Sequence, residues 1–459
     1  MENKDKKVLL RVEHLSQHFK FGKHVLRAVD DVNFEIYKGE VFGLVGESGC
    51  GKTTTGRTII RLYDATGGSV YFDDKRIVAG TFEYKQAIKM ARMAYKQKVA
   101  ALDKELKDLP EEEQTNRAKE FEEKKAALKA DYEVIRSENI DKIRSAKFDH
   151  NNCNKEFAKF EVQKVVDKYE PLLKAKQDEL NEAKNKLSEN SSDASLQEEY
   201  NKKKQEFDEL NAQFKEEKRI AGKDRIMNKI QMIFQDPIAS LDPRMTVRDI
   251  IAEGLIIRGI RDKKYINEQV YKVLEMVGLV QEHATRYPHE FSGGQRQRIG
   301  IARAIILKPE LIIADEPISA LDVSIQAQVI NLLNDLREQM GLTIMFIAHD
   351  LSVVKYFSDR IAVMYYGHIV ELTDSDELFK HPLHPYTKSL LSAIPLPDPN
   401  YEKKRKRITY NPLSAHDYSK EGPTMREILP GHFILCNSEE FAKYQEEIKQ
   451  LDAQNKKKR

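Results

Sequence analysis

Apolar positions recur with different periods along the chain, and the changes of period divide it into segments. Residues 9–46 form short alternating runs broken by turn signals, and the continuous apolar run at 41–46 predicts a buried strand. A helical pattern follows at 53–63, and strand-like residues return at 69–74 after a Gly-Gly turn. The order strand, loop, helix, strand is typical of an α/β domain.

The pattern changes abruptly after Gly80, because no further glycine occurs before Gly222. This stretch is dense in charges of both signs and contains only the prolines at 110 and 171, so it predicts long helices rather than a globule. Breaks are predicted where turn residues cluster, at 108–111, 150–154 and 188–195.

Between these breaks, apolar residues recur at heptad spacing. They are Leu173, Leu180 and Leu187 in one segment and Leu196, Tyr200, Phe207, Leu210 and Phe214 in the next, with Lys203 out of pattern. The spacing predicts an antiparallel coiled-coil hairpin, since heptads would have no purpose in a disordered charged linker. Because the insertion leaves and re-enters one domain, its ends should lie close together. An even number of arms satisfies this, and arms of roughly 30 residues would project on the order of 45 Å. Such arms would either dock a partner or be a tolerated decoration.

From Asp224 onward a mixed pattern resumes, with helices expected around 246–279 and 294–307. Strands are expected at 310–314, 342–348 and 360–364. Beyond about residue 376 prolines cluster, and the basic run 403–407 and a charged helix follow, which together predict a partly extended appendage. The predicted domains are 1–80, the first part of an α/β domain; 81–228, the helical insertion; 229–375, the second part of the α/β domain; and 376–459, a C-terminal extension.

Composition limits the possible partners. The chain has 76 Lys and Arg against 74 Asp and Glu, a net charge of +2, so no overall field attracts it to nucleic acid. The N-terminal residues do not resemble a secretory signal, so we expect a cytoplasmic chain. No run of about 18 apolar residues occurs, so any membrane work would have to be done by a partner. Three separated cysteines without a CxxC pair indicate reduced thiols and no zinc site.

A phosphate-binding motif follows the first buried strand. Residues 46–53 fit G-x-x-x-x-G-K-[ST] between a predicted strand and a helix. Its backbone N–H groups would surround the phosphates, Lys52 would reach the β- and γ-phosphates, and the Thr53 hydroxyl would bind Mg²⁺. Cys50 is either a thiolate favoured by the helix N-terminus or a small space-filling residue. The predicted nucleotide contacts are Gly46, Glu47, Ser48, Gly49, Cys50, Gly51, Lys52, Thr53 and Thr54.

Two carboxylates end the apolar run at residues 311–314. Asp315 is placed to hold Mg²⁺ through water, and Glu316 is placed to polarise an attacking water. Seen alone, an Asp-Glu pair after a strand is often only a helix start.

The segment Phe291–Arg298, FSGGQRQR, resembles the signature sequence of the ABC ATPase family. The resemblance implies that Ser292, Gly293, Gly294 and Gln295 bind the γ-phosphate held by an opposite subunit. Further matches follow in the family's order: Gln235 resembles the Q-loop, Asp322 the D-loop, His349 the H-loop, and Phe19 the aromatic that stacks on adenine, a place that Phe21 or His18 could also take. Phe19 could equally be a core aromatic.

This resemblance implies an α/β fold of the ABC-type P-loop NTPase, with a RecA-like core, an antiparallel β subdomain and an α-helical subdomain. It implies ATP and Mg²⁺ as cofactors, with Glu316, His349 and Gln235 catalytic and Thr53, Gln235 and Asp315 around the metal.

The resemblance sharpens at residues 235–247, 316–328 and 381–399, which look like the ATPases of oligopeptide and dipeptide importers, and at 430–444, which is similar to the OppF (AmiF) type. Some relatives carry an iron–sulfur centre in the C-terminal region. Only Cys436 is present here, so that centre is not expected.

The resemblance implies an ATPase subunit on the cytoplasmic face of the membrane. Because one chain carries one P-loop and one signature, two ATPase subunits must meet, and the family implies a sister subunit in a heterodimer. It also implies two permease subunits and an external peptide-binding protein, and no nucleic acid. The alternative is a DNA-maintenance ATPase of the SMC or Rad50 kind, but its arms would emerge after Gln235, whereas this insertion precedes Gln235. Ribosome-acting relatives carry two ATPase domains per chain.

Overall fold

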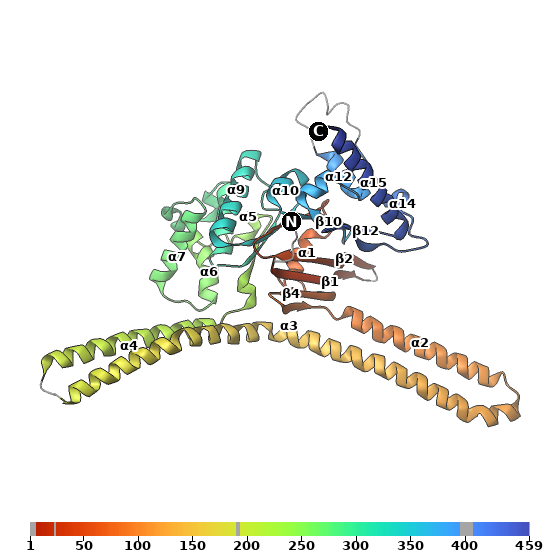
Figure 1. The fold of residues 1–459 in the computed structure, drawn as a ribbon, viewed down its shortest axis with the longest axis horizontal. Helices are drawn as coiled ribbons and strands as arrows, with labels where there is room; N and C mark the ends of the chain where they lie inside the picture. Colours follow the sequence, from red (N-terminus) through yellow and green to blue (C-terminus); the bar gives the residue numbers. More distant parts are fainter. Residues whose placement is uncertain (1–5, 23, 190–192, 395–406, 459) are drawn as a thin grey trace. The chain divides into compact units, whose positions relative to one another are not determined.

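The computed structural model describes residues 6–22, 24–189, 193–394 and 407–458 (Figure 1). The chain divides into two compact units, unit 1 with residues 1–151 and 343–459 and unit 2 with residues 152–342. The boundary at 151/152 falls inside α3 (Glu111–Glu189), a single helix of 79 residues that contributes to both units. Each unit is described by itself.

Unit 1 begins with a four-stranded antiparallel sheet in the order β2-β1-β4-β5. Its strands are β1 (Val8–Phe21), β2 (His24–Tyr37), β4 (Gly67–Phe72) and β5 (Lys75–Ala79). Along β1 and β2 buried residues alternate with more exposed ones, as expected for strands with one face on a core. This confirms the predicted β-rich start of the chain.

The second sheet of unit 1 is built around β3 (Val41–Val45), which is buried along its whole length. It pairs in parallel with β8 (Thr343–Ala348) on one side and with β9 (Arg360–Tyr365) on the other. Because all five residues are buried, both faces of this strand are covered, which explains the uninterrupted run VFGLV. The helices α1 (Lys52–Ile59) and α10 (Leu351–Phe357) follow β3 and β8.

The partly extended C-terminal appendage that the sequence predicts adds strands to this sheet. β9 pairs with β10 (His368–Asp374), β10 with β12 (His432–Cys436), and β12 with β11 (Thr424–Leu429), all antiparallel. Their apolar face packs with Leu383 and α15 (Ser438–Lys458). The short helices α11 (Ser375–Lys380), α12 (Pro385–Ala393) and α14 (Pro412–Ala415) join these strands. Of the predicted basic run, only Arg407 lies in the described part of the chain.

Unit 2 contains the parallel pair β6 (Ile230–Ile233) and β7 (Leu311–Asp315) and a group of helices. The helices expected around 246–279 are found as two, separated at Gly259, which adopts a left-handed φ of 86°. The helical elements are η2 (Ile226–Lys229), α5 (Pro237–Ser240), α6 (Val247–Ile257), α7 (Lys263–Met276), η3 (Gln281–Thr285), η4 (Pro288–Glu290), α8 (Gly293–Ile305) and α9 (Val323–Met340). Within the described ranges no helix has the length and apolar character needed to cross a bilayer.

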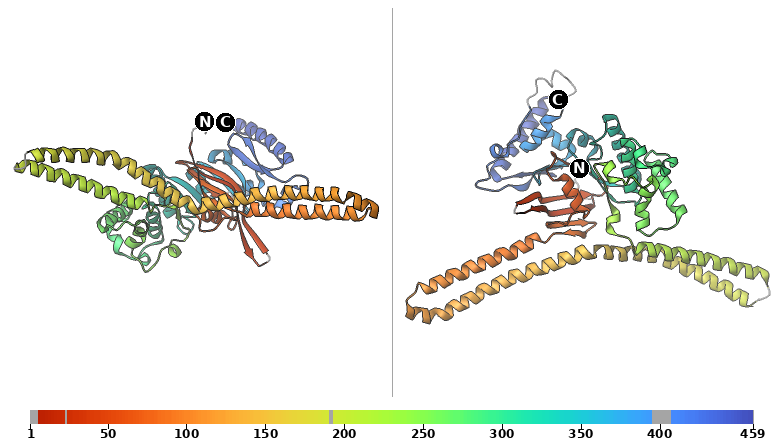
Figure 2. Two further views of the ribbon diagram at one scale, coloured as in Figure 1. Left: turned by 90° about the horizontal axis from the view of Figure 1, so that it is seen from below. Right: turned by 180° about the vertical axis from the view of Figure 1, so that it is seen from behind.

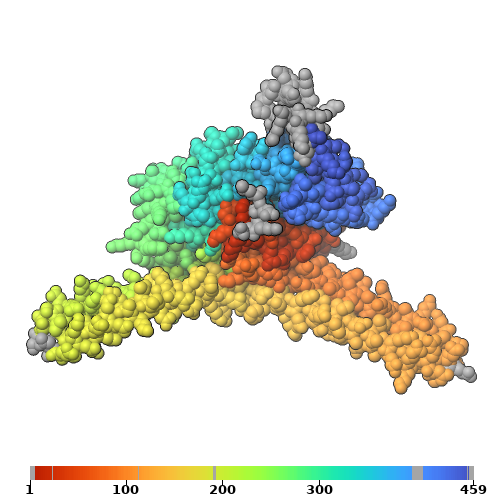
Figure 3. Space-filling model, viewed as in Figure 1, coloured from red at the N-terminus to blue at the C-terminus, as the bar shows by residue number. Residues whose placement is uncertain are grey.

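The insertion forms helical hairpins, as predicted, but there are two and they share α3. In unit 1, α2 (Phe82–Lys107) runs antiparallel to the first part of α3, with the rings of Tyr95 and Tyr132 stacked 5.6 Å apart and Lys125 2.8 Å from Asp103. We call this hairpin arm 1. Figure 2 shows it from two directions, and in Figure 3 its side chains form a continuous orange ridge.

In unit 2, α4 (Ala194–Ala221) runs antiparallel to the last part of α3 and forms arm 2 (Figure 2). The rings of Tyr169 and Phe214 meet at 5.6 Å. The predicted heptad residues are the partly covered positions of this seam. Lys203 breaks the apolar pattern but still lies in the seam. Its ammonium group donates a hydrogen bond of 2.5 Å to the carboxylate of Glu179 on the facing helix. The insertion therefore consists of three helices, α2, α3 and α4, which form two hairpins instead of the one that was predicted.

The predicted break at 150–154 is wrong, because these residues lie inside α3. Their polar groups make contacts within each unit instead of turning the chain. His150 receives a hydrogen bond of 2.8 Å from Arg61 in unit 1, and Asn154 accepts one of 3.2 Å from the backbone N–H of Ile226 in unit 2. The break at 108–111 is confirmed, since α2 ends at Lys107 and α3 begins at Glu111. At the third predicted break, α3 ends at Glu189 and α4 begins at Ala194, and residues 190–192 lie outside the described part.

Candidate functional site

The phosphate-binding motif connects β3 with α1 in unit 1. Gly46 has φ 155° and Gly51 has φ 111°, and a Cβ at either would come within 2.2 Å of a backbone carbonyl oxygen, that of Met364 or Ala28. The loop is therefore packed against β9 and β2 so closely that only glycine fits at these two positions. Glu47, Ser48 and Gly49 form the exposed part of the loop. This conformation leaves a concave run of backbone ahead of a helix N-terminus, the arrangement that binds phosphate.

The Lys52 side chain turns back along this loop. Its ammonium group donates hydrogen bonds to the carbonyl oxygens of Gly46 at 2.7 Å and Glu47 at 2.9 Å, and only 3% of the residue is exposed. The charge is thus held beneath the loop at the start of α1. A phosphate bound above the loop would meet it there.

The burial of Cys50 favours the space-filling interpretation over the thiolate one. The residue is 6% exposed, and burial raises the pKa of its thiol despite the neighbouring Lys52. A raised pKa disfavours the thiolate, so the burial of Cys50 opposes the effect of the helix N-terminus. Cys153 and Cys436 are also free and buried, which agrees with the predicted reduced thiols.

His349 comes to the same edge of the sheet as the loop. The parallel register pairs Val45 with Ala348, so Gly46 and His349 each follow directly after paired residues. Residues at the carboxyl ends of neighbouring parallel strands surround a ligand in many α/β proteins. His349 itself is exposed. The sequence correctly placed this residue after a buried strand.

The three aromatic candidates for adenine stacking lie on β1. Phe19 is partly covered, and its ring meets that of Tyr63 edge-on at 5.4 Å. His18 is held by Asp30 at 3.2 Å, whereas Phe21 is 64% exposed. The choice of Phe19 stays a prediction.

Unit 2 brings Gln235 and the two carboxylates together. Asp315 ends β7 and is fully buried, and Glu316 follows at a positive φ of 43°, a conformation that non-glycine residues adopt at some energetic cost. The Gln235 side chain, two residues beyond β6, donates a hydrogen bond of 3.1 Å to the Glu316 carboxylate. Because β6 and β7 are parallel neighbours, the oxygen donors at their carboxyl ends converge. Hard oxygen ligands of this kind suit Mg²⁺.

The signature residues form the N-terminus of α8. Ser292 is the N-cap: its hydroxyl accepts from the N–H of Gln295 at 3.4 Å, and the Gln295 side chain accepts from the N–H of Ser292 at 3.0 Å. Ser292 and Gly293 are exposed, so this helix end is accessible to an anion. A Cβ on Gly294 would lie 2.6 Å from Ile325, so glycine permits close packing of α8 against α9.

Asp322 lies beside the signature as the N-cap of α9. Its carboxylate accepts from the N–H of Ile325 at 3.0 Å and from the Ser324 hydroxyl at 2.7 Å. The Ser324 hydrogen bond lowers the pKa of this carboxyl. The carboxylate is therefore ionised at neutral pH and orients the loop that precedes α9.

Sequence reasoning missed one residue in contact with the phosphate loop. The hydroxyl of Tyr386 accepts a hydrogen bond of 2.9 Å from the backbone N–H of Glu47. The two residues are separated by 339 positions, so spacing along the chain gave no sign of the contact. The only available signal was the HPLHPYT segment, which carried the family resemblance without indicating a role.

The sequence model of the ABC transporter family matches residues 29–205 and 195–319, and that of the oligopeptide/dipeptide transporter C-terminal region matches 370–422. The oligopeptide transport ATP-binding protein OppF of Bacillus subtilis is 44% identical over 436 residues, covering 94% of this chain and 97% of its own. AmiF of Streptococcus pneumoniae is 38% identical, covering 95% and 97%.

The phosphate loop, the strand-end carboxylates and these matches define an ATP-hydrolysing ABC cassette. More particularly, the chain belongs to the family of OppF and AmiF oligopeptide transport ATP-binding proteins. This membership, over more than nine tenths of the chain, favours a transporter subunit over the coiled-coil DNA-maintenance ATPase considered above.

Proposed function

We propose that this chain binds ATP at residues 46–54 and hydrolyses it to drive oligopeptide uptake through partner permease subunits. The observation that carries the proposal is the geometry of the phosphate loop, in which glycine backbone packs against β9 and β2 and Lys52 lies beneath the loop. Phe19 would stack on adenine. The peptide substrate follows from the family and not from the site.

Within this proposal Mg²⁺ is held by Thr53, Gln235 and Asp315. The buried Asp315 carboxylate and the Gln235 amide oxygen are donors of the kind that Mg²⁺ prefers, and the bound ion would neutralise charge on the phosphates. Glu316 would orient the attacking water, and His349 would contact the γ-phosphate.

The catalytic unit in this proposal is a dimer on the cytoplasmic face of the membrane. Ser292, Gly293, Gly294 and Gln295 present an exposed helix N-terminus, which supports their binding the γ-phosphate held by a sister ATPase subunit. Two permease subunits and an external peptide-binding protein would complete the transporter.

A strain that lacks this gene should lose uptake of a labelled oligopeptide, because no other subunit would supply this half of the ATPase dimer. The wild-type gene should restore uptake, whereas Lys52→Ala should not, since the ammonium that meets the phosphates is removed. Western blotting would check that both proteins reach equal levels. Restoration of uptake by Lys52→Ala would contradict the assignment.

We further propose that arm 1 docks a partner, in preference to being a decoration. Four large apolar side chains on it are exposed near the Tyr95–Tyr132 stack: Met90, Met93, Val134 and Ile135 are 62%, 48%, 55% and 42% exposed. All four lie within five residues of Tyr95 or Tyr132 along the chain, and exposed apolar groups on a charged helical arm are costly in water unless a partner covers them.

Shortening either arm should leave MgATP binding by the purified chain unchanged, because the contacts of each arm tip are between its own helices. The Tyr95–Tyr132 and Tyr169–Phe214 contacts show which residues of the paired helices lie opposite each other in each arm. The deletion ends are chosen opposite each other in the same way, so that the remaining helices keep their pairing. A Gly-Ser turn would replace residues 89–138 in one variant and 172–211 in the other. Peptide uptake should fall only in the first, which removes the apolar group. Normal uptake with both variants would favour decoration.

A further inference from the structure

The hydrogen bond between Tyr386 and Glu47 joins the C-terminal part of unit 1 to the phosphate loop. Tyr386 lies in the first turn of α12 and is 1% exposed. Its hydroxyl oxygen accepts the N–H of Glu47 at 2.9 Å. A buried hydroxyl used in this way fixes the orientation of the peptide unit that it contacts.

Lys52 donates a hydrogen bond to the same peptide unit. The N–H of Glu47 and the carbonyl of Gly46 belong to the same planar peptide, and Lys52 donates to that carbonyl at 2.7 Å. The peptide is therefore held from both sides, by a phenol at its N–H and by an ammonium at its oxygen. Rotation of the peptide would break both hydrogen bonds together.

The position of Tyr386 is fixed by its aromatic neighbours. Its ring packs against Tyr365 at 4.4 Å and Tyr410 at 5.5 Å between ring centres. Burial raises the pKa of the Tyr386 phenol, so the hydroxyl stays neutral at physiological pH. The ring has little freedom to move unless Tyr410 moves as well.

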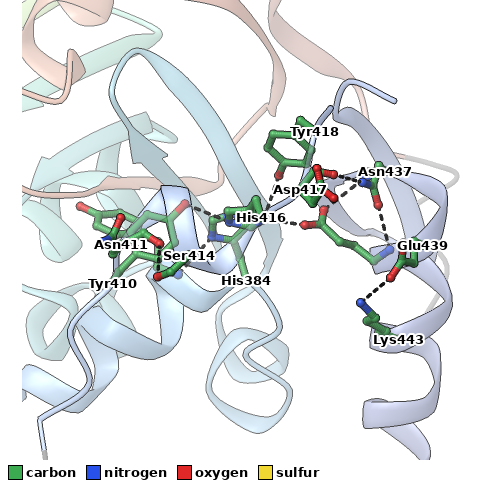
Figure 4. A network of polar contacts seen from close by, with 12 residues as sticks. His384, Tyr410, Asn411, Ser414, His416, Asp417, Tyr418, Asn437, Glu439 and Lys443 are labelled. Atoms are coloured by element: carbon green, nitrogen blue, oxygen red, sulfur yellow. Dashed lines mark hydrogen bonds and ion pairs between the residues drawn. The ribbon is translucent and has the colours of Figure 1, made fainter. Parts of the chain in front are cut away.

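The start of α12 is held by a second set of buried contacts. His384 caps the helix by accepting the N–H of Tyr386 at 3.1 Å, and burial lowers the pKa of His384 to about 3, which keeps its ring neutral and able to accept. His384 stacks on His416, which is bonded to the Tyr410 hydroxyl at 3.0 Å and to Glu440 at 2.6 Å (Figure 4). The contacts run without interruption from α15 to the phosphate loop.

We propose that Tyr386 is a positioning residue for nucleotide binding, which holds the Gly46–Glu47 peptide and through it Lys52 in the conformation that receives the phosphates. The described contacts from α15 through His416 and His384 to Tyr386 thereby influence the affinity of the chain for ATP. The proposal rests on the assignment of residues 46–54 as the nucleotide site. In this proposal the segment His384–Thr387 (HPYT) helps to hold the phosphate loop in its binding conformation.

The test is Tyr386→Phe in the full chain, which removes one oxygen and keeps the ring packing. Binding of MgATP, measured by calorimetry, should weaken about three- to tenfold, the usual worth of one hydrogen bond. In ATPase assays KM should rise by a similar factor while kcat stays near the wild-type value. The matched control is Tyr410→Phe, which loses a hydroxyl from the same aromatic cluster without touching the loop and should keep wild-type affinity.

Two further results separate the possible failures. If Lys52→Ala binds MgATP as tightly as the wild type, the nucleotide site itself is misassigned. If Lys52→Ala loses binding but Tyr386→Phe does not, the positioning role is overturned. Equal weakening by Tyr386→Phe and Tyr410→Phe would also overturn it, because the effect would then come from the aromatic cluster and not from the bond to Glu47.

Discussion

Glu316→Gln should bind MgATP as tightly as the native chain and hydrolyse it about 10²-fold more slowly or worse. The substitution keeps the size of the side chain, so Gln235 and the turn after β7 retain a partner, but an amide cannot polarise the attacking water as a carboxylate does. Nucleotide would therefore stay bound, and the dimer with the sister subunit should persist in MgATP. Steady-state turnover and gel filtration with and without MgATP measure the two effects.

Glu310→Gln provides the matched control. Glu310 directly precedes β7, and its carboxylate pairs with Lys229 at 3.5 Å, so the same chemical change is made at the opposite end of the same strand. Its turnover should equal that of the wild type. Wild-type turnover by Glu316→Gln in the assembled transporter would remove Glu316 from the mechanism.

Glu371→Ala should lower the free energy of unfolding by about 3–5 kcal/mol, the usual cost of removing one partner of a buried ionic network. The Glu371 carboxylate is fully buried and accepts hydrogen bonds from the N–H groups of Leu383 and His384, each at 3.0 Å, and from the His432 ring at 2.9 Å. Without it, these donors would be left in the interior with no acceptor. Calorimetry should show a melting transition at clearly lower temperature.

Glu427→Ala is the comparison for that experiment. This exposed carboxylate also accepts a backbone N–H, that of Gly431 at 2.8 Å, but water can replace it. Its effect on stability should stay within about 0.5 kcal/mol, as for most surface substitutions. If Glu371→Ala and Glu427→Ala melt at the same temperature, the buried network contributes less to the stability of the fold than its geometry implies.

The parts of the fold that were predictable are those whose signals are local. The apolar strand at 41–45, the glycine loop after it and the heptads of arm 2 each occupy one continuous segment, and each was confirmed as an element. Lys203 shows the limit of such patterns, because its partner Glu179 lies on the other helix of the arm. A polar residue in a seam can be interpreted only when the residue facing it is known.

The failures have a common physical cause. His150 and Asn154 have the composition of a turn, yet they stay helical because distant groups, the Arg61 side chain and the Ile226 amide, use their polar atoms. Tyr386 could not be linked to Glu47 for the same reason. Tertiary contacts overrode or supplemented local preference, and no periodicity encodes them. The catalytic roles of the site residues stay predictions.

The order of β3 and its neighbours along the chain has a consequence for synthesis on the ribosome. β3 is made of five buried residues, but both strands that enclose it, β8 and β9, lie about 300 residues further on. At ~5–20 residues per second, β3 would wait about 15–60 s before its pairing partners emerge. During that time an apolar strand with two open edges would be exposed to the cytosol. The nascent chain is therefore a strong candidate for chaperone binding, and the helical arms, whose contacts are local, should fold first.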